Sequence, residues 1–495
     1  MTNSASSTLT GTGSAQAAIL TSADLTTLGN GTISVAATAT DAAGNSGSNS
    51  TSFTLDTVAP TLTVSATVVD ALVPTTAASG SGTLNKFAST SALADGGYVR
   101  VWQSNKTGDF DIYGQVYNAD GSARGAQFVV NSSTTGDQGV PLVVALKGSN
   151  AGKFVVTWVN GSTTPYTATF ARVFSTSGST VTADAAAVQL SGSSYTRYDN
   201  ISETFSGITA LSNGGFVLTN MHSNWSAYMH IYDGTLSLAS VANGVQIQNV
   251  GVSNWPDVVQ LTNGNLAAIY MCDSTVNSST RDVYLSIYNP STSTWVTSSS
   301  VLINTVAVNS SSERFPKLAA LTDGSMVLVW QSDTTGSNGI DVYMQRLDAS
   351  GNKLGSNVRV NTTTANTQGW PDVLSLKDGG YLVYWRAQSV DGSGYAVVAQ
   401  RYDNTGTAVG SETRINRAFT SADQVVTSAI QLANGDIVFT YQNQNTTDMS
   451  ATPGVDAATI ATLEHDDATL QRWSSRFTTA ATTWRARASS RRPPA

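Results

Sequence analysis

Several aspartates of this chain have a spacing that would allow them to bind a metal ion. Asp41 and Asp56 stand at one end of a pair of predicted strands, and Asp109 and Asp111 are two positions apart. Calcium prefers six to eight oxygen ligands from closely spaced carboxylates and carbonyls. We therefore predict candidate calcium sites at these four residues, although no stretch carries the full D-x-D-x-D-G loop and aspartate also forms ordinary turns.

Tryptophans outside the main apolar runs could bind a sugar. Trp225, Trp255, Trp295 and Trp370 lie in stretches that the pattern places near loops. Because exposed aromatic rings can stack on the apolar faces of sugars, we predict Trp225 and Trp295 as candidate ligand-binding residues. Trp255 and Trp370 each precede a proline in a Trp-Pro-Asp-Val sequence, so we interpret them as plugs between packed repeats.

The sequence offers few groups of residues that could form a catalytic site. It has only four glutamates, which leaves few partners for an acid/base pair. A sialidase-like enzyme would need an arginine cluster and a tyrosine nucleophile with a glutamate partner. The sequence Glu313-Arg314-Phe315-Pro316 only weakly resembles the arginine motif of that family. We therefore expect a protein that is not an enzyme.

The elements that would position these residues repeat along the chain. A Gly-containing turn followed by an apolar run occurs seven times, and the runs end 50 to 62 residues apart. The last residues of the runs are Trp102, Trp158, Asn220, Tyr270, Trp330, Trp385 and Tyr441. A period of roughly 40 to 60 residues with several strands per unit is typical of a β-propeller.

One repeat shows the predicted strands of a propeller blade. Residues 316–321 form a small-residue strand, 326–330 an apolar strand, 340–348 an alternating strand and 358–361 a short outer strand. Four strands per unit is the number in a propeller blade. The predicted fold class is therefore all-β, with a seven-bladed β-propeller over residues 85–450.

The end of the chain departs from the repeats. The seventh copy has its first two strands, but residues 451–495 contain one glycine and end in an arginine-rich stretch. We expect the last blade to be incomplete, and either to borrow outer strands from residues 62–75 or to stay partly open. The segment 451–495 is predicted to be an atypical tail that is disordered or reads out of frame, and a basic tail for an anionic partner is the alternative.

The first 62 residues do not follow the sequence pattern of the repeats. Alternating residues over 31–41 and a second run over 50–56 predict two strands. Two or three strands are too few for an independent sandwich, so residues 1–62 are predicted to be an incomplete domain. Residues 63–84 are rich in Thr, Ala, Ser and Gly and are predicted to be a linker.

Several phrases between Leu20 and Pro60 resemble a known repeat. They are Ser22-Ala23-Asp24-Leu25, Thr40-Asp41-Ala42-Ala43-Gly44-Asn45 and Leu55-Asp56-Thr57-Val58-Ala59-Pro60. They look like the second half of the bacterial Ig-like repeats of giant, biofilm-associated surface adhesins that are exported by type I secretion. The resemblance implies a partial Ig-like β-sandwich fragment and a longer parent chain with adjoining Ig-like domains.

The repeat region carries a second resemblance. Phrases such as Leu374-Ser375-Leu376-Lys377-Asp378-Gly379-Gly380-Tyr381 are similar to tandem propeller-type repeats of large calcium-dependent secreted bacterial proteins. This resemblance implies an extracellular or cell-surface location and calcium as a cofactor. It brings no residue-level active site with it.

Composition excludes two classes of partner. The net charge is −8 and only 12% of residues are charged, which argues against nucleic-acid binding. The sequence contains no run of about 18 apolar residues, so no membrane span is predicted. We predict a non-catalytic, calcium-supported adhesion or interaction module of a bacterial surface protein that binds a cell-surface or matrix glycan or protein. The alternative is a carbohydrate-binding or glycosidase-like propeller of the lectin or sialidase type.

Overall fold

The computed structural model describes residues 31–40, 43–55, 85–160, 168–190, 207–221, 226–238, 244–247, 253–273, 281–297, 300–304, 312–333, 339–416, 423–444 and 455–463. Contacts divide the chain into two units, Met1–Val64 and Ser65–Ala495. None of the described residues belongs to a helix long and apolar enough to cross a membrane.

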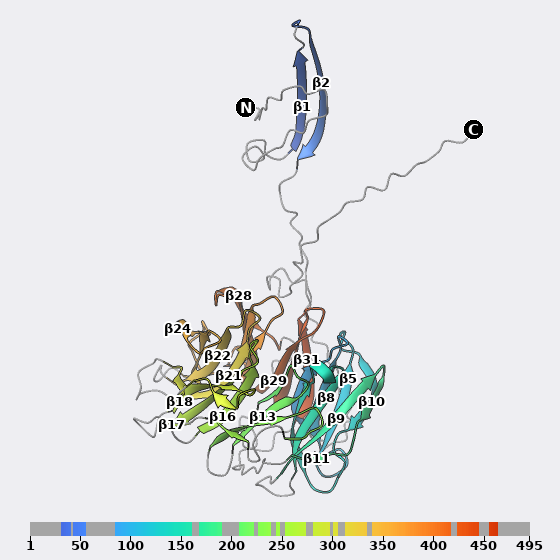
Figure 1. The fold of residues 1–495 in the computed structure, drawn as a ribbon, viewed down its shortest axis with the longest axis vertical. Coiled ribbons are helices and arrows are strands. Elements are labelled where there is room, and N and C mark those ends of the chain that lie inside the picture. Colours follow the sequence, from blue (N-terminus) through green and yellow to red (C-terminus); the bar gives the residue numbers. More distant parts are fainter. Residues whose placement is uncertain are drawn as a thin grey trace, which may run out of the picture. The chain divides into compact units, whose positions relative to one another are not determined.

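The first unit contains a β-hairpin. Strands β1 (Gly31–Thr40) and β2 (Ser46–Leu55) pair in antiparallel fashion, with Gly31 opposite Leu55 and Thr40 opposite Ser46 (Figure 1). The two predicted strands are confirmed, and the second begins four residues earlier than its apolar run. The Ig-like identity of this fragment stays a prediction, because a hairpin alone does not define a sandwich.

The described part of the second unit consists of seven antiparallel sheets whose strands follow chain order. The first contains β3 (Asn85–Ala92), β4 (Tyr98–Ser104), β5 (Asp111–Tyr117) and β6 (Ala123–Val129). The second contains β7 (Gln138–Ala145), β8 (Lys153–Asn160), β9 (Ala168–Ser177), β10 (Thr180–Ala183) and β11 (Val188–Gln189), with a 3₁₀ turn at Gly148–Asn150. The third contains β12 (Ile208–Ala210), β13 (Phe216–Met221), β14 (Ala227–Tyr232) and β15 (Val245–Gln246).

The remaining four sheets repeat this plan. The fourth contains β16 (Ser253–Gln260), β17 (Leu266–Asp273), β18 (Arg281–Asn289), β19 (Thr294–Trp295) and β20 (Val301–Leu302). The fifth contains β21 (Glu313–Ala320), β22 (Met326–Ser332), β23 (Asp341–Leu347) and β24 (Lys353–Arg359). The sixth contains β25 (Gln368–Ser375), β26 (Tyr381–Gln388), β27 (Tyr395–Tyr402) and β28 (Ala408–Arg414), and the seventh contains β29 (Asp423–Gln431), β30 (Ile437–Gln444) and β31 (Val455–Leu463).

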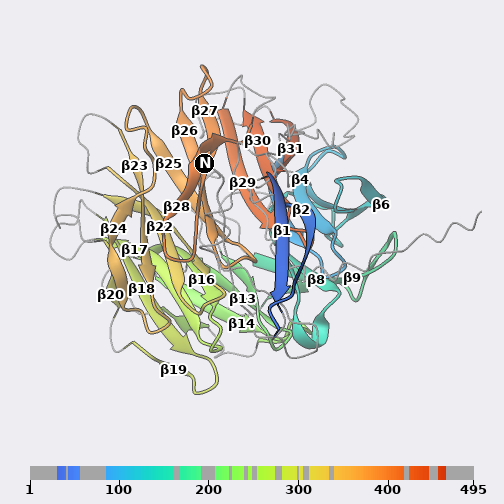
Figure 2. The same cartoon turned by 90° about the horizontal axis from the view of Figure 1, so that it is seen from above.

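The first strands of the sheets contact one another in cyclic order. Strand β3 contacts β7, and the series continues through β12, β16, β21, β25 and β29, which returns to β3. Figure 2 shows the sheets of this unit arranged around a common centre. This is the arrangement of a β-propeller, in which each sheet buries its faces only against its neighbours.

Hydrophobic side chains fill the spaces between neighbouring sheets. Each of seven clusters joins two successive sheets, and one of them packs Tyr98 and Tyr117 of the first sheet against Leu432 and Val438 of the seventh. The rings of Tyr98 and Tyr117 stack with centroids 4.9 Å apart. The apolar runs of the sequence are thus buried on both faces, as their near-continuous hydrophobicity predicts.

Recurring asparagines join the outer strand of a sheet to the strand beside it. Asn361 Nδ2 donates to Asp341 Oδ1 over 2.6 Å, and Asn361 Oδ1 accepts from Val342 N over 2.8 Å. Asn131 makes the equivalent pair of bonds in the first sheet and Asn304 in the fourth. The asparagines and the Asp-x-Tyr sequences that recur along the chain therefore form one structural device.

The seventh sheet continues past the predicted end of the repeats. Strand β31 pairs with β30, with Ile437 opposite Leu463 and Gln444 opposite Val455. The predicted boundary at residue 450 differs from the structure here, because Val455–Leu463 supplies a third strand. Residues 62–75, the predicted source of borrowed strands, lie outside the described residues.

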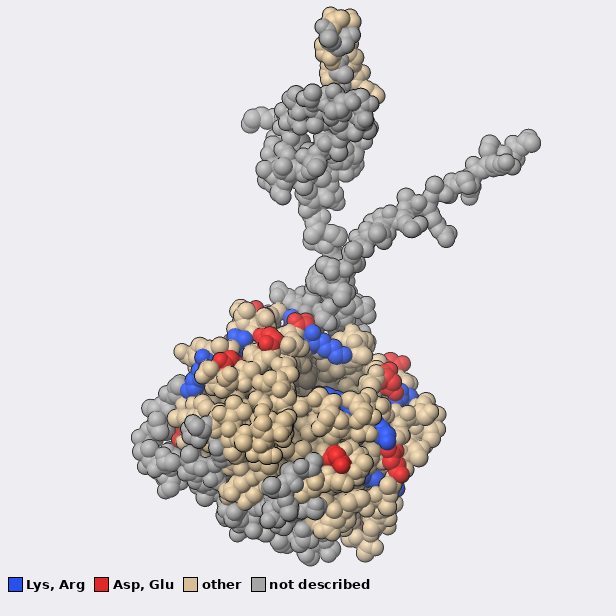
Figure 3. Space-filling view, in the orientation of Figure 1, with Lys and Arg blue, Asp and Glu red and all other residues tan. Residues whose placement is uncertain are grey.

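Charged side chains are sparse and mixed on the surface. Figure 3 shows Lys and Arg beside Asp and Glu on the visible face of the second unit, with wide areas of uncharged residues between them. No basic stripe runs over the described residues of that face.

Candidate functional site

A repeated irregularity in the first strands builds the candidate site. In five sheets a non-glycine residue of the first strand has a positive φ, between 48° and 53°. These residues are Phe87, Val140, Trp255, Phe315 and Trp370. The pairing register shifts at each of them, which makes each a β-bulge. Bulges re-aim side chains, and a bulky residue held at positive φ costs about 1–3 kcal/mol.

Proline and the neighbouring sheets support these bulges. Proline follows the positive-φ residue in four of the five strands, where its missing N–H costs no ladder hydrogen bond. Gln331 Oε1, from the fifth sheet, accepts from Trp370 N over 2.9 Å. In the same way, Gln103 Oε1 of the first sheet accepts from Val140 N of the second sheet over 3.0 Å. The strained backbone is therefore fixed by side chains of the preceding sheet.

The bulges of the fourth, fifth and sixth sheets bring aromatic rings together. Trp255 meets Phe315 edge to face with centroids 5.3 Å apart, and Phe315 stacks on Trp370 at 5.7 Å. The Arg386 guanidinium lies 5.0 Å from the Trp370 ring centroid, and Tyr395 meets Trp370 edge-on at 5.8 Å. Trp370 is thus held between aromatic and cationic neighbours.

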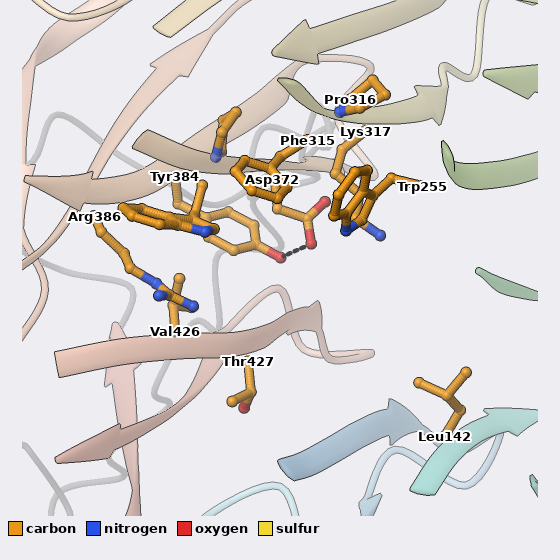
Figure 4. A pocket seen from close by; sticks show the side chains of 12 residues that line it. Leu142, Trp255, Phe315, Pro316, Lys317, Asp372, Tyr384, Arg386, Val426 and Thr427 are labelled. Carbon is orange, nitrogen blue, oxygen red and sulfur yellow. Dashed lines mark hydrogen bonds between the residues drawn. The ribbon is translucent and has the colours of Figure 1, made fainter. Parts of the chain in front are cut away.

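A cavity of about 110 Å³ lies beside this array (Figure 4). It is lined by Leu142, Trp255, Phe315, Pro316, Lys317, Trp370, Pro371, Asp372, Tyr384, Arg386, Val426 and Thr427. Because these residues come from the second, fourth, fifth, sixth and seventh sheets, the cavity lies where the sheets converge. We call it the axial pocket. Its volume has room for several water molecules or one small polar ring.

Three charged residues occupy equivalent places in three successive first strands. Asp257, Lys317 and Asp372 each stand two residues after the positive-φ residue of their strand. Lys317 Nζ lies 3.6 Å from Asp257 Oδ2. Asp257 Oδ1 and Asp372 Oδ1 each accept from the backbone N–H of the following residue, over 3.0 Å and 2.7 Å. We call these three residues the charged arc.

Tyr384 completes the polar side of the pocket. Its hydroxyl donates to Asp372 Oδ2 over 2.9 Å (Figure 4). Tyr384 is only 3% exposed, so this bond is shielded from bulk water. Gly207 of the third sheet leaves room at the other end of the arc, because a Cβ there would collide with Asp257 Oδ1.

Burial and mutual charge set the ionisation of this cluster. Burial raises the pKa of Asp372, Lys317 opposes that shift, and Asp257 adds to it. Burial would lower the pKa of Lys317, but the Asp257 and Asp372 carboxylates outweigh burial and raise it. Burial and the nearby Asp372 carboxylate raise the pKa of Tyr384 well above its usual range. Lys317 therefore stays charged and Tyr384 stays a neutral donor at physiological pH.

The structure describes two of the four predicted calcium ligands. Asp41 and Asp56 lie outside the described residues. Asp109 is exposed and its Oδ2 accepts from Gly136 N over 3.1 Å. Asp111 is buried and accepts from Asn131 Nδ2 over 2.6 Å and from Thr107 Oγ1 over 2.9 Å.

Metal ligands do not cluster in the described ranges. Three or more His, Cys, Asp or Glu side chains never come together there in a way that could hold an ion. Calcium binding therefore stays a prediction of the sequence.

Of the two predicted ligand-binding tryptophans, the structure describes Trp295. Trp225 is outside the described residues. Trp295, on β19, is half-buried and meets Tyr288 edge to face at 5.1 Å. It contributes to the cluster between the third and fourth sheets and not to the axial pocket.

Trp255 and Trp370 line the axial pocket instead. In the sequence interpretation both residues plug the space between packed repeats. In the structure both rings contact Phe315 of the fifth sheet, and both also line the pocket. The signal for the site was present in the repeated Trp-Pro-Asp phrase and in Phe-Pro-Lys at the same place of the fifth repeat. Glu313 and Arg314 precede that phrase but do not line the pocket.

Comparisons with known proteins give distant structural likeness. No protein-family model matches the chain, and no curated protein matches it in sequence. A protein of unknown function from Dyadobacter fermentans has 12% identity and a TM-score of 0.42, over 77% of this chain and 94% of that one. An α-L-arabinanase from Penicillium chrysogenum, complexed with arabinobiose, has 11% identity and a TM-score of 0.40, over 77% of this chain and 93% of the enzyme. Polysaccharide lyase Uly1 has 10% identity and a TM-score of 0.42, over 74% of this chain and 87% of the lyase.

Proposed function

We propose that the chain is a carbohydrate-binding protein, built as a seven-bladed β-propeller that takes one sugar unit into the axial pocket. One observation carries this proposal: aromatic rings and ionisable side chains from three successive sheets line the same pocket. Small-molecule sites combine apolar walls with a few convergent polar groups in this way. The proposal favours the carbohydrate-binding alternative of the sequence over a general adhesion role.

Each wall of the pocket has a part in binding. Trp255 and Phe315 offer apolar surface to the C–H face of a sugar ring, whereas Trp370 is already enclosed by Phe315 and Arg386. The carboxylate of Asp372 accepts hydrogen bonds from sugar hydroxyls, and Lys317, which Asp257 holds from outside the lining, donates to hydroxyl oxygens. The strained bulges keep these groups in place before the ligand arrives, which reduces the entropy lost on binding.

Glycan binding by the full chain tests the proposal. A panel of mono- and oligosaccharides is screened on an array, and hits are measured by calorimetry. We expect Trp255→Ala to weaken binding about tenfold or more, as expected for loss of an aromatic anchor. Trp295→Ala is the matched control, because it removes a half-buried tryptophan outside the pocket. Equal loss in both variants, or no binding to any glycan, would contradict the proposal.

Hydrolysis is the second candidate function. The observation that favours it is that Asp372, whose pKa is raised by burial, lines the pocket, while a second carboxylate, Asp257, lies beside the lining residue Lys317. Glycoside hydrolysis uses such a pair, with one carboxylic acid protonating the leaving oxygen while a carboxylate activates water or attacks the sugar. Reducing ends released from bound oligosaccharides measure it, and Asp372→Asn should abolish the release. A glycan that binds but is not cleaved would contradict hydrolysis and support binding as the function.

An adhesion role within a longer bacterial surface protein stays a prediction. It rests on the sequence resemblance of residues 1–62 and of the repeats, as do the extracellular location and the calcium cofactor. A glycan-binding pocket is compatible with that role, since adhesion to a surface glycan would use the same contacts.

A further inference from the structure

We propose that the axial pocket selects neutral sugars and excludes uronic and other acidic sugars, an inference that rests on the proposed function above. The carrying observation is the arrangement of charges around the pocket. Both cations of the lining act electrostatically on carboxylates of the protein, and Lys317 lies beside one of them.

Lys317 is the first of the two cations. It stands between Asp257 and Asp372 on the charged arc, with its Nζ 3.6 Å from Asp257 Oδ2. Both carboxylates act on it electrostatically. An ammonium that two carboxylates already attract has little net positive potential to offer a third.

Arg386 is the second cation of the lining. It is 2% exposed and its guanidinium covers the Trp370 ring at 5.0 Å. Its charge also acts on Asp423, a buried aspartate of β29.

Hydrogen-bonding capacity leads to the same specificity. An ionised carboxylate only accepts hydrogen bonds, so Asp372 of the lining can take further donors from a ligand but offers none. Sugar hydroxyls are donors and can bond to Asp372. A uronate carboxylate has no hydrogen to give and would face the like charge of Asp372, with that of Asp257 on the far side of the arc, in a partly buried site, where water and salt screen poorly.

Matched sugar pairs test this selectivity with the full chain. Glucose is compared with glucuronate, and galactose with galacturonate, by calorimetry or ligand-observed NMR at neutral pH. We expect the neutral member to bind and its acidic partner to have an affinity that is lower by about tenfold or more. An acidic sugar that binds as tightly as its neutral partner overturns the inference and leaves the proposed function standing. No binding by either member of any pair, or of a wider glycan panel, overturns both.

Two substitutions assign the selectivity to the arc. Asp372→Asn keeps the shape and removes one charge, so the neutral-to-acidic affinity ratio should shrink severalfold. Lys317→Met removes the ammonium, and the ratio should grow. If Lys317 instead anchors an acidic sugar, the wild-type protein binds the acidic member at least as tightly as the neutral one, which contradicts the inference. Asp120→Asn, in the exposed turn between β5 and β6, is the control and should leave the ratio unchanged.

Discussion

Tyr384 donates its hydroxyl hydrogen to Asp372 Oδ2 over 2.9 Å, and the two residues lie opposite each other on β26 and β25. The same carboxylate accepts from Val373 N through its other oxygen. Both oxygens of Asp372 are therefore held by neighbouring groups, and the side chain reaches the pocket in one fixed orientation. A ligand meets a carboxylate whose position does not have to change on binding.

Loss of the tyrosine hydroxyl should raise the pKa of Asp372 further. The hydrogen bond from Tyr384 favours the charged form of the carboxylate, so Tyr384→Phe removes a contribution that lowers this pKa. We also expect a loss of about 1–3 kcal/mol in the free energy of unfolding, because the bond is buried. Carboxyl-carbon NMR titration measures the pKa, and urea unfolding measures the stability. Tyr343→Phe on β23 is the control, and a titration of Asp372 identical in both variants would disprove the role of the hydroxyl.

Stability should fall as pH rises through the titration of Asp372. Its folded-state pKa lies above the ordinary value of 3.8, because burial disfavours the charge, Lys317 only partly opposes this and Asp257 reinforces it. A raised pKa gives a stabilising contribution that is complete below pH 3.8 and is lost as pH rises through the folded-state pKa. We expect wild-type protein to lose stability relative to Asp372→Asn over this interval. Urea unfolding in a pH series checks this, and parallel curves for the two proteins would refute it.

The hairpins of the fold could be predicted from sequence because their causes are local. In the turn between β21 and β22, Asp323 Oδ1 accepts from Ser325 N over 2.9 Å and Gly324 has a φ of 87°. Two or three residues determine such a turn, so each Gly-containing phrase marks a hairpin. Strand β31 follows β30 directly in the chain, but no such turn phrase precedes Val455–Leu463, and its contact with β3 joins segments far apart in the sequence.

The site could be predicted only in part, because it forms where distant strands converge. Trp255 and Trp370 stand out in the sequence, but their approach to Phe315 depends on the closure of the ring and on a positive φ. Asp109 and Asp111 form a pair in the sequence, but Asp109 lies before β5, where it is exposed and its Oδ2 accepts from Gly136 N, whereas Asp111 is buried at the start of β5. Asp111 bonds to Asn131 as part of the repeated device.

The asparagine device should be worth a measurable part of the stability. Asn361 donates to Oδ1 of the buried Asp341 carboxylate and accepts from the Val342 N–H. Asn361→Ala leaves both groups without this partner, so we expect a loss of about 1–3 kcal/mol in the free energy of unfolding. Asn404→Ala, in the exposed turn between β27 and β28, is the control. Similar urea midpoints for the two variants would show that the device contributes little.

Calcium dependence is a prediction that the sequence makes on its own. We expect calcium to raise the melting temperature of the full chain and a chelator to reverse the shift, because binding to the folded state stabilises it by mass action. Since Asp111 is already bonded to Asn131 and Thr107, the shift should depend on Asp41 and Asp56. Melting with and without calcium in the Asp41→Asn and Asp56→Asn variants measures this. A shift that both variants retain would exclude these two ligands.

Strand β31 should be needed to close the ring. It pairs with β30 and contacts β3, so it joins the last sheet to the first. A chain that ends at Gly454 lacks this strand, and we expect a lower melting temperature and faster proteolysis, because the edge of β30 and part of the interface with β3 become exposed. A chain that ends at Glu464 is the matched control, since it keeps β31 and removes the arginine-rich segment. Equal melting of the two truncated chains would mean that the first six sheets and the β29–β30 hairpin close the ring without β31.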